Sequence, residues 1–388
     1  MDKEFVCPRC GNSHPKYIGY LKGKPYCRFC ISMKGKEANK NQSRNPPVVT
    51  KLNYKLSKEQ SHISNQLVKN YKERVDTLVN AVCGAGKTEL VFAVIAHCVS
   101  LNKTVAFAVP RRDVAIELYQ RIHGVFGENH VVLVCGGHND KLEGDIVVLT
   151  THQLYRYDHY FDLIILDEID AFPFKNNKLL SSMFFRAIKG PIIMMSATPS
   201  DDVIKFFRRK NKKIIELNAR FHRHPLPVPV VVKKFGFLKL FFVINQIKKY
   251  VSEGKKTFVF APTIEKCEKI WKFLGIFIKK GTFIHSKCKN RSELIKNFKD
   301  GKYDYFVTTA VLERGVTFKN LQVIIYDADN EMYDSQTLIQ IAGRVGRKID
   351  APDGEVVFLV NKETEDIKNA ITTIKRKNES LQNMLSTN

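Results

Sequence analysis

From about residue 57 onward, short apolar runs rich in valine and isoleucine alternate with longer amphipathic stretches. Such runs are typical of strands buried on both faces of a parallel sheet, and the stretches between them are typical of helices that cover the sheet. The alternation therefore predicts an α/β fold. The predicted strands span residues 77–83, 104–110, 145–150, 162–167, 191–197, 256–262, 281–286, 303–309, 321–327 and 354–360.

One segment interrupts this alternation. Residues 220–230, RFHRHPLPVPV, hold three prolines in a short span, and proline breaks both helices and central strands. The chain has 388 residues and is 44% hydrophobic, which is enough for more than one core. We predict two similar α/β domains in tandem, at residues 51–220 and 221–388. A small module at residues 1–33 precedes them, and the polar, lysine- and asparagine-rich residues 34–50 form a linker.

The C-terminal stretch predicts an amphipathic helix. We expect it to pack on the second domain, with a partner helix as the alternative. Its apolar residues share one helical face and are Ile367, Ile371, Ile374, Leu381 and Leu385.

The chain is strongly basic. Lysine and arginine number 63 against 39 acidic residues, which gives a formal net charge of +24 and a pI near 9.6. Such an excess suits a polyanionic partner, either nucleic acid or an anionic membrane face. No run reaches the roughly 18 apolar residues of a membrane span, and the N-terminus lacks the apolar core of a signal peptide. We expect a cytoplasmic protein, with peripheral attachment to the inner face of the membrane as a further expectation.

Four of the nine cysteines form two close pairs. Cys7 and Cys10 lie in CPRC, and Cys27 and Cys30 lie in CRFC, with sixteen residues between the two pairs. Two residues between thiolates let each pair hold one ion from a tight turn, and four sulfur ligands make a closed tetrahedral Zn²⁺ site. The glycine, proline and tyrosine content between the pairs predicts a short ribbon. The alternatives are two unrelated reduced pairs or a redox pair.

The sequence leaves three roles open for this zinc module. A bound ion supplies folding energy to the module itself. The module also has the chemistry to dock a partner or to touch DNA through basic side chains. These side chains are Lys16, Lys22, Lys24 and Arg28.

Residues 81–90, AVCGAGKTEL, predict a phosphate-binding loop. They follow an apolar strand and precede an apolar helical run, which is the setting such a loop requires. The backbone N–H groups from Gly84 to Thr88 would cradle a phosphate at a helix N-terminus, Lys87 would reach the β- and γ-phosphates, and Thr88 would ligate Mg²⁺. Ala81 replaces the usual first glycine, but that position requires only a small residue in a tight bend.

An acidic pair supports this prediction. Asp167 and Glu168 follow the apolar run DLIIL directly. A magnesium-binding Asp occupies this position in nucleotide hydrolases, and a following acid is placed to orient and polarise the attacking water. Read alone, the pair is an ordinary solvated turn.

Three further segments follow in an order and at a spacing that indicate the same nucleotide-hydrolysing site. SATPS follows a buried strand and contains Ser196 and Thr198, and TTAVLERGVTF contains Arg314 and Gly315. QIAGRVGR contains Arg344 and Arg347, whose i, i+3 spacing aims both guanidinium groups at one side of a helical turn. Such a pair suits the charge that spreads over a γ-phosphate in the transition state.

These motifs resemble superfamily 2 helicases and translocases of the DEAD-like type over roughly residues 57–361. Together with the cysteine pairs, TTHQLYR, DEIDAFPF, RFHRHPLPVP and TTAVLERGVTF resemble the ComFA family of late competence proteins from Gram-positive bacteria. The resemblance implies two RecA-like domains and an ATP- and Mg²⁺-dependent motor on single-stranded DNA during uptake of transforming DNA. It also implies two partners, namely the uptake channel at the inner membrane face and phosphoribosyltransferase-like ComFC. A homo-oligomer is a further expectation.

The resemblance assigns roles to matching residues. Gln60 in LSKEQ would select adenine, and the catalytic residues would be Lys87, Asp167, Glu168, Arg344 and Arg347. The other nucleotide contacts would be Gly84, Ala85, Gly86, Thr88, Glu89 and Gly315. Residues that couple hydrolysis to domain movement would be Ser196, Ala197, Thr198 and Gln340. Many RNA helicases of the DEAD group carry histidine at the last position, so Gln340 argues against that branch.

Loops that follow the strands are the expected sites of DNA contact. Their hydroxyl, amide and basic groups suit phosphates, which are bound without reading sequence. The residues are Pro110, Arg111, Arg112, Thr150, Thr151, Gln153, Thr263, His285, Ser286, Lys287 and Thr309. Each is alternatively a helix cap or a solvated basic turn.

Two other functions remain open on the sequence. The first is an RNA-remodelling helicase of the DEAD-like type. The second is an adaptor without motor activity that binds ATP as a switch and uses zinc to recruit partners; intact Glu168, Arg344 and Arg347 oppose it.

Overall fold

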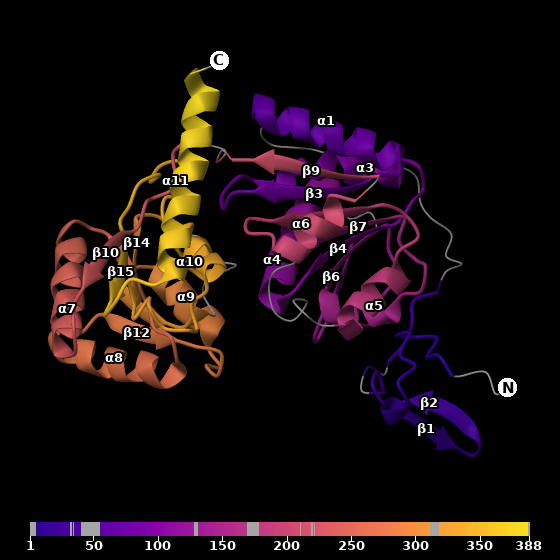
Figure 1. The fold of residues 1–388 in the computed structure, drawn as a ribbon, viewed down its shortest axis with the longest axis horizontal. Coiled ribbons are helices and arrows are strands. Elements are labelled where there is room, and N and C mark those ends of the chain that lie inside the picture. The colour runs from indigo at the N-terminus through magenta and orange to yellow at the C-terminus, as the bar shows by residue number, and fades with distance from the viewer. Residues whose placement is uncertain are drawn as a thin grey trace. The chain divides into compact units, whose positions relative to one another are not determined.

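The computed structural model describes residues 5–31, 33, 35–39, 55–127, 131–168, 178–209, 211–218, 220, 222–310 and 318–386. The chain divides into two compact units (Figure 1). One unit comprises residues 1–80 and 86–216, and the other comprises residues 81–85 and 217–388.

The first unit is built on a sheet of seven described strands in the order β5-β6-β4-β7-β8-β3-β9. The central strands β4, β6 and β8 are buried along their whole length, which explains their continuous apolar sequences. The strands are β3 (Asp76–Ala81), β4 (Val105–Val109), β5 (Val131–Val134), β6 (Ile146–Thr150), β7 (Leu163–Asp167), β8 (Ile192–Ser196) and β9 (Lys212–Leu217).

Helices connect the strands of this sheet. They are α1 (Lys58–Lys72), α2 (Lys87–Leu90), α3 (Phe92–Ser100), α4 (Arg112–Phe126), the 3-10 helix η2 (Thr151–Arg156), α5 (Lys178–Ala187) and α6 (Asp201–Phe207). A capping box starts α1: the Gln60 N–H donates to Ser57 Oγ at 3.1 Å, and the Ser57 N–H donates to Gln60 Oε1 at 2.9 Å. Ile63 and Leu67 lie on the apolar face of α1 and are buried.

The N-terminal module contains the predicted ribbon. A short 3-10 helix, η1 (Pro15–Tyr17), leads into the antiparallel hairpin of β1 (Ile18–Leu21) and β2 (Lys24–Cys27). Lys22 and Gly23 form its two-residue turn with φ of 48° and 72°, the left-handed conformation that matches the twist of a hairpin.

The second unit is built on six described strands in the order β10-β15-β14-β11-β13-β12, and every pair is parallel. A Cβ atom at Gly281 would lie 1.9 Å from the Tyr305 ring of the next strand, so only glycine fits there. The strands are β10 (Val230–Lys233), β11 (Lys256–Phe260), β12 (Gly281–Ile284), β13 (Tyr305–Thr308), β14 (Leu321–Tyr326) and β15 (Val356–Val360).

The helices of the second unit are α7 (Phe237–Ser252), α8 (Ile264–Phe277), α9 (Arg291–Lys299), α10 (Ser335–Ala342) and α11 (Glu365–Ser386). The C-terminal helix α11 packs against α10 and buries Ile367, Ile374 and Leu381. The predicted packing of this helix on its own domain is therefore confirmed, although the side chain of Leu385 lies outside the described residues.

The predicted fold class is confirmed, because both units are parallel-sheet α/β domains of the RecA-like type. Each predicted strand coincides with an observed one within a few residues at either end. The sequence interpretation omitted β5, β9 and β10. All three lie at the edge of a sheet: β5 and β10 are apolar but only four residues long, and β9 alternates exposed with buried residues.

The predicted linker at residues 34–50 lies mostly outside the described residues, and the part that is described, residues 35–39, packs on the first unit. Within the described part of the chain, no helix has both the length and the hydropathy needed to cross a membrane.

Candidate nucleotide site and metal centre

Three predicted motifs meet at one edge of the first sheet. Strands β7, β8 and β3 are neighbours, and their register pairs Asp167 with Met195 and Asn80 with Ser196. Because parallel strands place their carboxyl ends at the same edge, the acidic pair, the SAT turn and the phosphate loop all leave the sheet there. Motifs spread over more than one hundred residues of sequence thus leave the sheet at one edge.

The phosphate loop has the backbone that its glycines predict. Gly84 and Gly86 adopt φ of 84° and 74°, which favours glycine, and Gly86 caps the N-terminus of α2. Lys87 is the first residue of that helix, and Thr88 is buried behind it. Ala81 ends β3 with no exposed surface, so the sheet accommodates its methyl group.

Gln60 lies against the loop. A Cβ atom at Gly86 would come within 2.6 Å of Gln60 Nε2, so the glycine leaves room for this amide. The side-chain oxygen of Gln60 serves the cap of α1, and the residue is buried. The structure thus places the predicted adenine contact beside the phosphate loop, and its selection of adenine stays a prediction.

The acidic pair has an unusual backbone. Asp167 is the last residue of β7, and Glu168 has a φ of 59°, the left-handed region that non-glycine residues rarely enter. The Glu168 N–H lies 3.0 Å from Asp167 Oδ1 and 3.1 Å from the carbonyl oxygen of Met195. Strained residues of this kind cluster at functional sites, which agrees with a catalytic role for the pair.

The SAT turn and Glu89 are held by contacts inside the first unit. The Thr198 N–H donates to Ser196 Oγ at 3.0 Å, and both side chains are buried, so this turn is rigidly tied to the end of β8. Glu89 forms an ion pair with Arg121 of α4. Coupling by Ser196, Ala197 and Thr198 and nucleotide contact by Glu89 stay predictions.

The predicted arginine fingers lie in a loop that follows α10. Arg344 is buried, whereas Arg347 is half-buried and donates from Nε to the Gly343 carbonyl oxygen at 3.0 Å. Gly346 has a φ of 67°, which allows the tight bend between them. Gln340, on α10, is also buried. Arg314 and Gly315 lie outside the described residues.

Sequence reasoning missed Arg220, which supports this loop. Its guanidinium donates from Nη1 to the Gly346 carbonyl oxygen at 2.8 Å and from Nη2 to that of Gly343 at 3.3 Å. The side chain is 2% exposed, and His222 Nε2 lies 3.0 Å from the same Gly346 oxygen. Burial and the nearby charge of Arg347 lower the pKa of Arg220 to about 10, so it remains a cation at neutral pH.

The residues around Arg220 in the sequence led us to expect an exposed side chain. It opens RFHRHPLPVPV, whose prolines mark a domain junction, and a charged residue in such a segment is usually exposed. Its role depends on carbonyl groups more than one hundred residues away, and no local pattern reveals those.

We expect Arg220→Lys to lower kcat for ATP hydrolysis about tenfold while KM changes less, because lysine lacks the planar fork that bridges two carbonyl groups. Steady-state hydrolysis over a range of ATP concentrations measures both constants. Arg223→Lys is the matched control, since Arg223 is an exposed arginine of the same segment. A wild-type kcat in Arg220→Lys would show that the contacts of Arg220 with the Gly343 and Gly346 carbonyl groups are not needed for hydrolysis.

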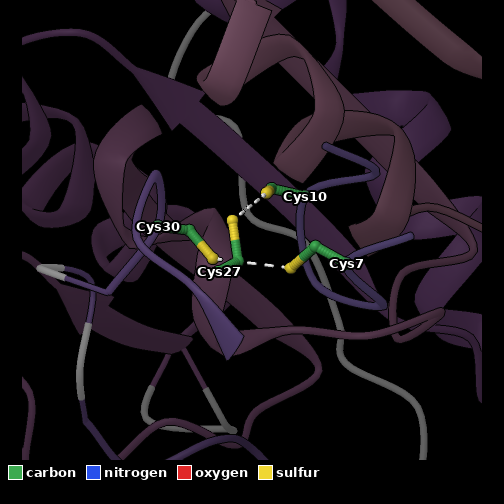
Figure 2. A group of neighbouring side chains, drawn as sticks. All are labelled: Cys7, Cys10, Cys27 and Cys30. Carbon is green, nitrogen blue, oxygen red and sulfur yellow. Dashed lines mark hydrogen bonds between the residues drawn. The ribbon is translucent and has the colours of Figure 1, made fainter. Parts of the chain in front are cut away.

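The four paired cysteines form a candidate metal centre. Their Sγ atoms lie within 4.8 Å of one another, and all four residues are buried (Figure 2). The Sγ separations are 3.7 Å for Cys7 and Cys30 and 3.7 Å for Cys10 and Cys27. A tetrahedron of Zn–S bonds near 2.3 Å has edges of about 3.8 Å, so the cluster fits Zn²⁺.

A metal ion must displace protons from these thiols to bind. Burial raises the pKa of Cys10 to about 11, and burial with neighbouring thiols raises the pKa of Cys30 further. Without a metal ion these two sulfur atoms stay protonated at neutral pH, whereas a bound Zn²⁺ would stabilise the thiolates. The residues thus suit a structural zinc site with no open position for catalysis.

The predicted DNA contacts of the first unit follow neighbouring strands. Residues 110–112 follow β4, Thr150 ends β6 and residues 151–153 follow it, and these strands pair in parallel, so both segments leave the same edge of the sheet. Thr150 and Thr151 are buried, and Pro110 is buried as well. Arg112 is exposed, and Arg111 and Gln153 are half-buried.

The predicted contacts of the second unit follow β11, β12 and β13, which are also neighbours. Thr263 caps α8, where its Oγ1 accepts from the Lys266 N–H at 3.2 Å. His285 is buried with Nε2 at 3.1 Å from Glu268, which turns its ring toward α8. Thr263, Ser286 and Lys287 are exposed, and Thr309 is half-buried.

Comparison with known proteins agrees with this architecture. Residues 53–201 match the family described as type III restriction enzyme, res subunit, and residues 239–348 match the helicase conserved C-terminal domain. Competence protein ComFA of Bacillus subtilis is 32% identical, with 97% of this chain and 86% of the relative covered. Competence protein ComFA of Streptococcus pneumoniae is 34% identical, with 97% and 90% covered.

Solved structures share the fold. S. cerevisiae Dbp5 bound to RNA and ADP BeF3 superposes with a TM-score of 0.62 at 16% identity, covering 83% of this chain and 91% of that one. RecG bound to a three-way DNA junction superposes with a TM-score of 0.59 at 21% identity, covering 85% and 48%. At these identities the likeness shows the fold alone.

Proposed function

The chain belongs to the ComFA family of competence proteins, and from that premise we propose that it is an ATP-driven motor on single-stranded DNA during uptake of transforming DNA. One observation carries the proposal. The phosphate loop, the acidic pair and the SAT turn leave three adjacent strands at one sheet edge of a helicase-type domain. A second domain of the helicase type, with the arginine loop, completes the pair that such ATPases use.

The residues divide the chemistry of ATP hydrolysis among themselves. Lys87 would hold the β- and γ-phosphates, and Thr88 and Asp167 would hold Mg²⁺. When bound, Mg²⁺ neutralises charge on the phosphates. Glu168 would orient the attacking water and take its proton, while Arg344 and Arg347 would stabilise charge that develops on the γ-phosphate.

DNA binding is proposed to rest on phosphate contacts. The net charge of +24 provides long-range attraction, and the loops after β4 and β6 present Arg112, Arg111 and Gln153 at one sheet edge. Such contacts are independent of base sequence, as a motor that accepts any incoming strand requires. Gln340 in place of the histidine of many DEAD-type RNA helicases favours DNA over RNA.

The proposal includes the cytoplasm as location and the inner face of the membrane as a place of peripheral attachment. One surface of the second unit supports the latter. Phe235, Phe237 and Leu238 are exposed next to Lys233 and Lys234, and apolar side chains beside lysines suit an anionic lipid surface. The uptake channel, phosphoribosyltransferase-like ComFC and a homo-oligomer are proposed as partners on the family resemblance alone.

Steady-state ATP hydrolysis tests the proposal. The purified protein is assayed without nucleic acid and with single-stranded DNA, duplex DNA or RNA, all at one salt concentration because phosphate contacts depend on salt. We expect single-stranded DNA to stimulate hydrolysis most. Equal or greater stimulation by RNA would favour an RNA-remodelling helicase, and no hydrolysis under any condition would favour an ATP-switched adaptor.

A further inference from the structure

The zinc module is continuous with the core of the first unit. The four cysteines belong to the same apolar cluster as Tyr155 and Phe184, and Phe29, Met33 and Ala38 pack against that cluster. The module therefore has a defined seat on the first domain, and this seat includes η2.

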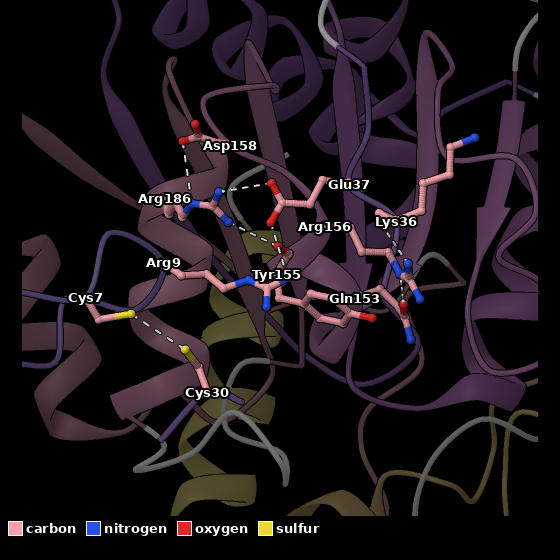
Figure 3. A network of polar contacts seen from close by, with 10 residues as sticks. All are labelled: Cys7, Arg9, Cys30, Lys36, Glu37, Gln153, Tyr155, Arg156, Asp158 and Arg186. Atoms are coloured by element: carbon pink, nitrogen blue, oxygen red, sulfur yellow. Dashed lines mark hydrogen bonds and ion pairs between the residues drawn. The ribbon is translucent and has the colours of Figure 1, made fainter. Parts of the chain in front are cut away.

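Arg9 connects the metal centre to that seat. It lies between the ligands Cys7 and Cys10, in a knuckle closed by the Gly11 N–H, which donates to the Cys7 carbonyl oxygen at 2.8 Å. Its guanidinium lies 3.2 Å from Glu37 Oε1 and stacks over the Tyr155 ring at 5.1 Å (Figure 3). A metal ion bound by Cys7 and Cys10 would therefore also hold the backbone of Arg9 in place.

Glu37 extends the connection to α5. Its second oxygen lies 3.4 Å from Nη2 of Arg186, so this carboxylate is shared by two arginines. Arg186 in turn donates from Nη1 to the Tyr155 carbonyl oxygen at 3.1 Å. The backbone and the ring of Tyr155 are both held by this network (Figure 3).

Arg156 carries the connection to a predicted DNA contact. It is buried, donates from Nη1 to the Lys36 carbonyl oxygen at 2.8 Å, and accepts at its own carbonyl oxygen from the Ala38 N–H at 2.9 Å. Its Nε donates to Gln153 Oε1 at 2.6 Å. Because the Gln153 oxygen is occupied, its NH₂ group is the end left to donate to a phosphate oxygen.

We propose that the zinc module is a positioning element for DNA binding: it holds η2, through Arg9, Glu37 and Arg156, so that Gln153 donates to the DNA backbone. The inference rests on the proposed single-stranded DNA function. It differs from direct contact by the module itself, because the network runs from Arg9 through Glu37 to Arg186 and Tyr155 of the first domain. Loss of zinc or of the Arg9 contact weakens DNA binding without removing any group that touches DNA.

The first test compares two arginines of the metal knuckles. Arg9→Ala removes the contact to Glu37, and Arg28→Ala removes the exposed arginine of CRFC. We measure zinc content and the affinity for fluorescent oligothymidylate by anisotropy, at one salt concentration. Arg9→Ala is expected to keep zinc and to bind about fivefold more weakly, while Arg28→Ala binds like the wild type.

A double-mutant cycle separates positioning from a general structural effect. If Arg9 acts through Gln153, then Arg9→Ala/Gln153→Ala binds no more weakly than Gln153→Ala alone. Additive losses would overturn the proposal. Glu37→Gln, which lies outside the metal knuckles, repeats the cycle if Arg9→Ala loses zinc or fails to fold.

The remaining outcomes are also distinguishable. Weakened binding by Arg28→Ala beside normal binding by Arg9→Ala would assign direct DNA contact to the module and overturn the proposal. Normal binding by Arg9→Ala and Glu37→Gln beside weakened binding by Gln153→Ala would overturn the positioning role only. No binding by the wild type would overturn the proposed function and this inference with it.

Discussion

Lys87→Ala is expected to abolish ATP turnover, with a loss of about a thousandfold or more. Lys87 opens α2 directly after the left-handed Gly86, at the N-terminus of that helix. Alanine keeps the helix but removes the cation that would hold the β- and γ-phosphates. Phosphate release at saturating ATP and single-stranded DNA measures the loss.

The control for this variant is Lys72→Ala, which removes an exposed lysine from the end of α1. It should hydrolyse ATP like the wild type, and both variants should unfold at the wild-type temperature, because neither lysine is in the core. Normal ATP turnover in Lys87→Ala would contradict the assignment of the phosphate loop.

Glu168→Gln is expected to bind ATP and to lose hydrolysis by about a hundredfold to a thousandfold. Glutamine keeps the length of the side chain, so the left-handed turn after β7 is retained, but an amide does not take a proton from water. Binding is measured with a fluorescent ATP analogue and hydrolysis in a single turnover, which separates the two steps.

Glu216→Gln is the matched control, because Glu216 is an exposed glutamate of β9 in the same sheet. It should change neither binding nor hydrolysis. Wild-type turnover in Glu168→Gln would contradict its role as the base, and loss of ATP binding would instead indicate that Glu168 supports the nucleotide pocket.

The nucleotide motifs were predictable because each is local. The phosphate loop requires left-handed backbone at Gly84 and Gly86, which glycine adopts readily. The acidic pair follows a continuous apolar run. In a parallel sheet every such run ends at the same edge, so the order of the motifs along the chain predicts their meeting in space. The cysteine pairs were predictable for the same reason, since two residues between thiolates define a knuckle and two knuckles define a tetrahedral site.

Other site features depend on neighbours that are distant in sequence. The guanidinium of Arg220 is held by the carbonyl groups of Gly343 and Gly346, and His285 turns inward to Glu268. Local patterns report burial and turn type but contain no information on such partners. From the sequence, Arg220 was therefore interpreted as part of a domain junction and His285 as part of a surface loop.

Hydrophobic period and motif spacing act over short stretches of chain, so the fold class, the two α/β units, the order of the strand-end motifs and the cysteine cluster were all predictable from the sequence. The seat of the zinc module and its contacts became known only from the folded chain. Arg9, Glu37 and Arg156 are spread over more than one hundred residues. Arg9 pairs with Glu37, and Arg156 reaches the Lys36 carbonyl oxygen, only when the module packs beside η2. Long-range pairing of this kind depends on how packed surfaces meet, which no local pattern records.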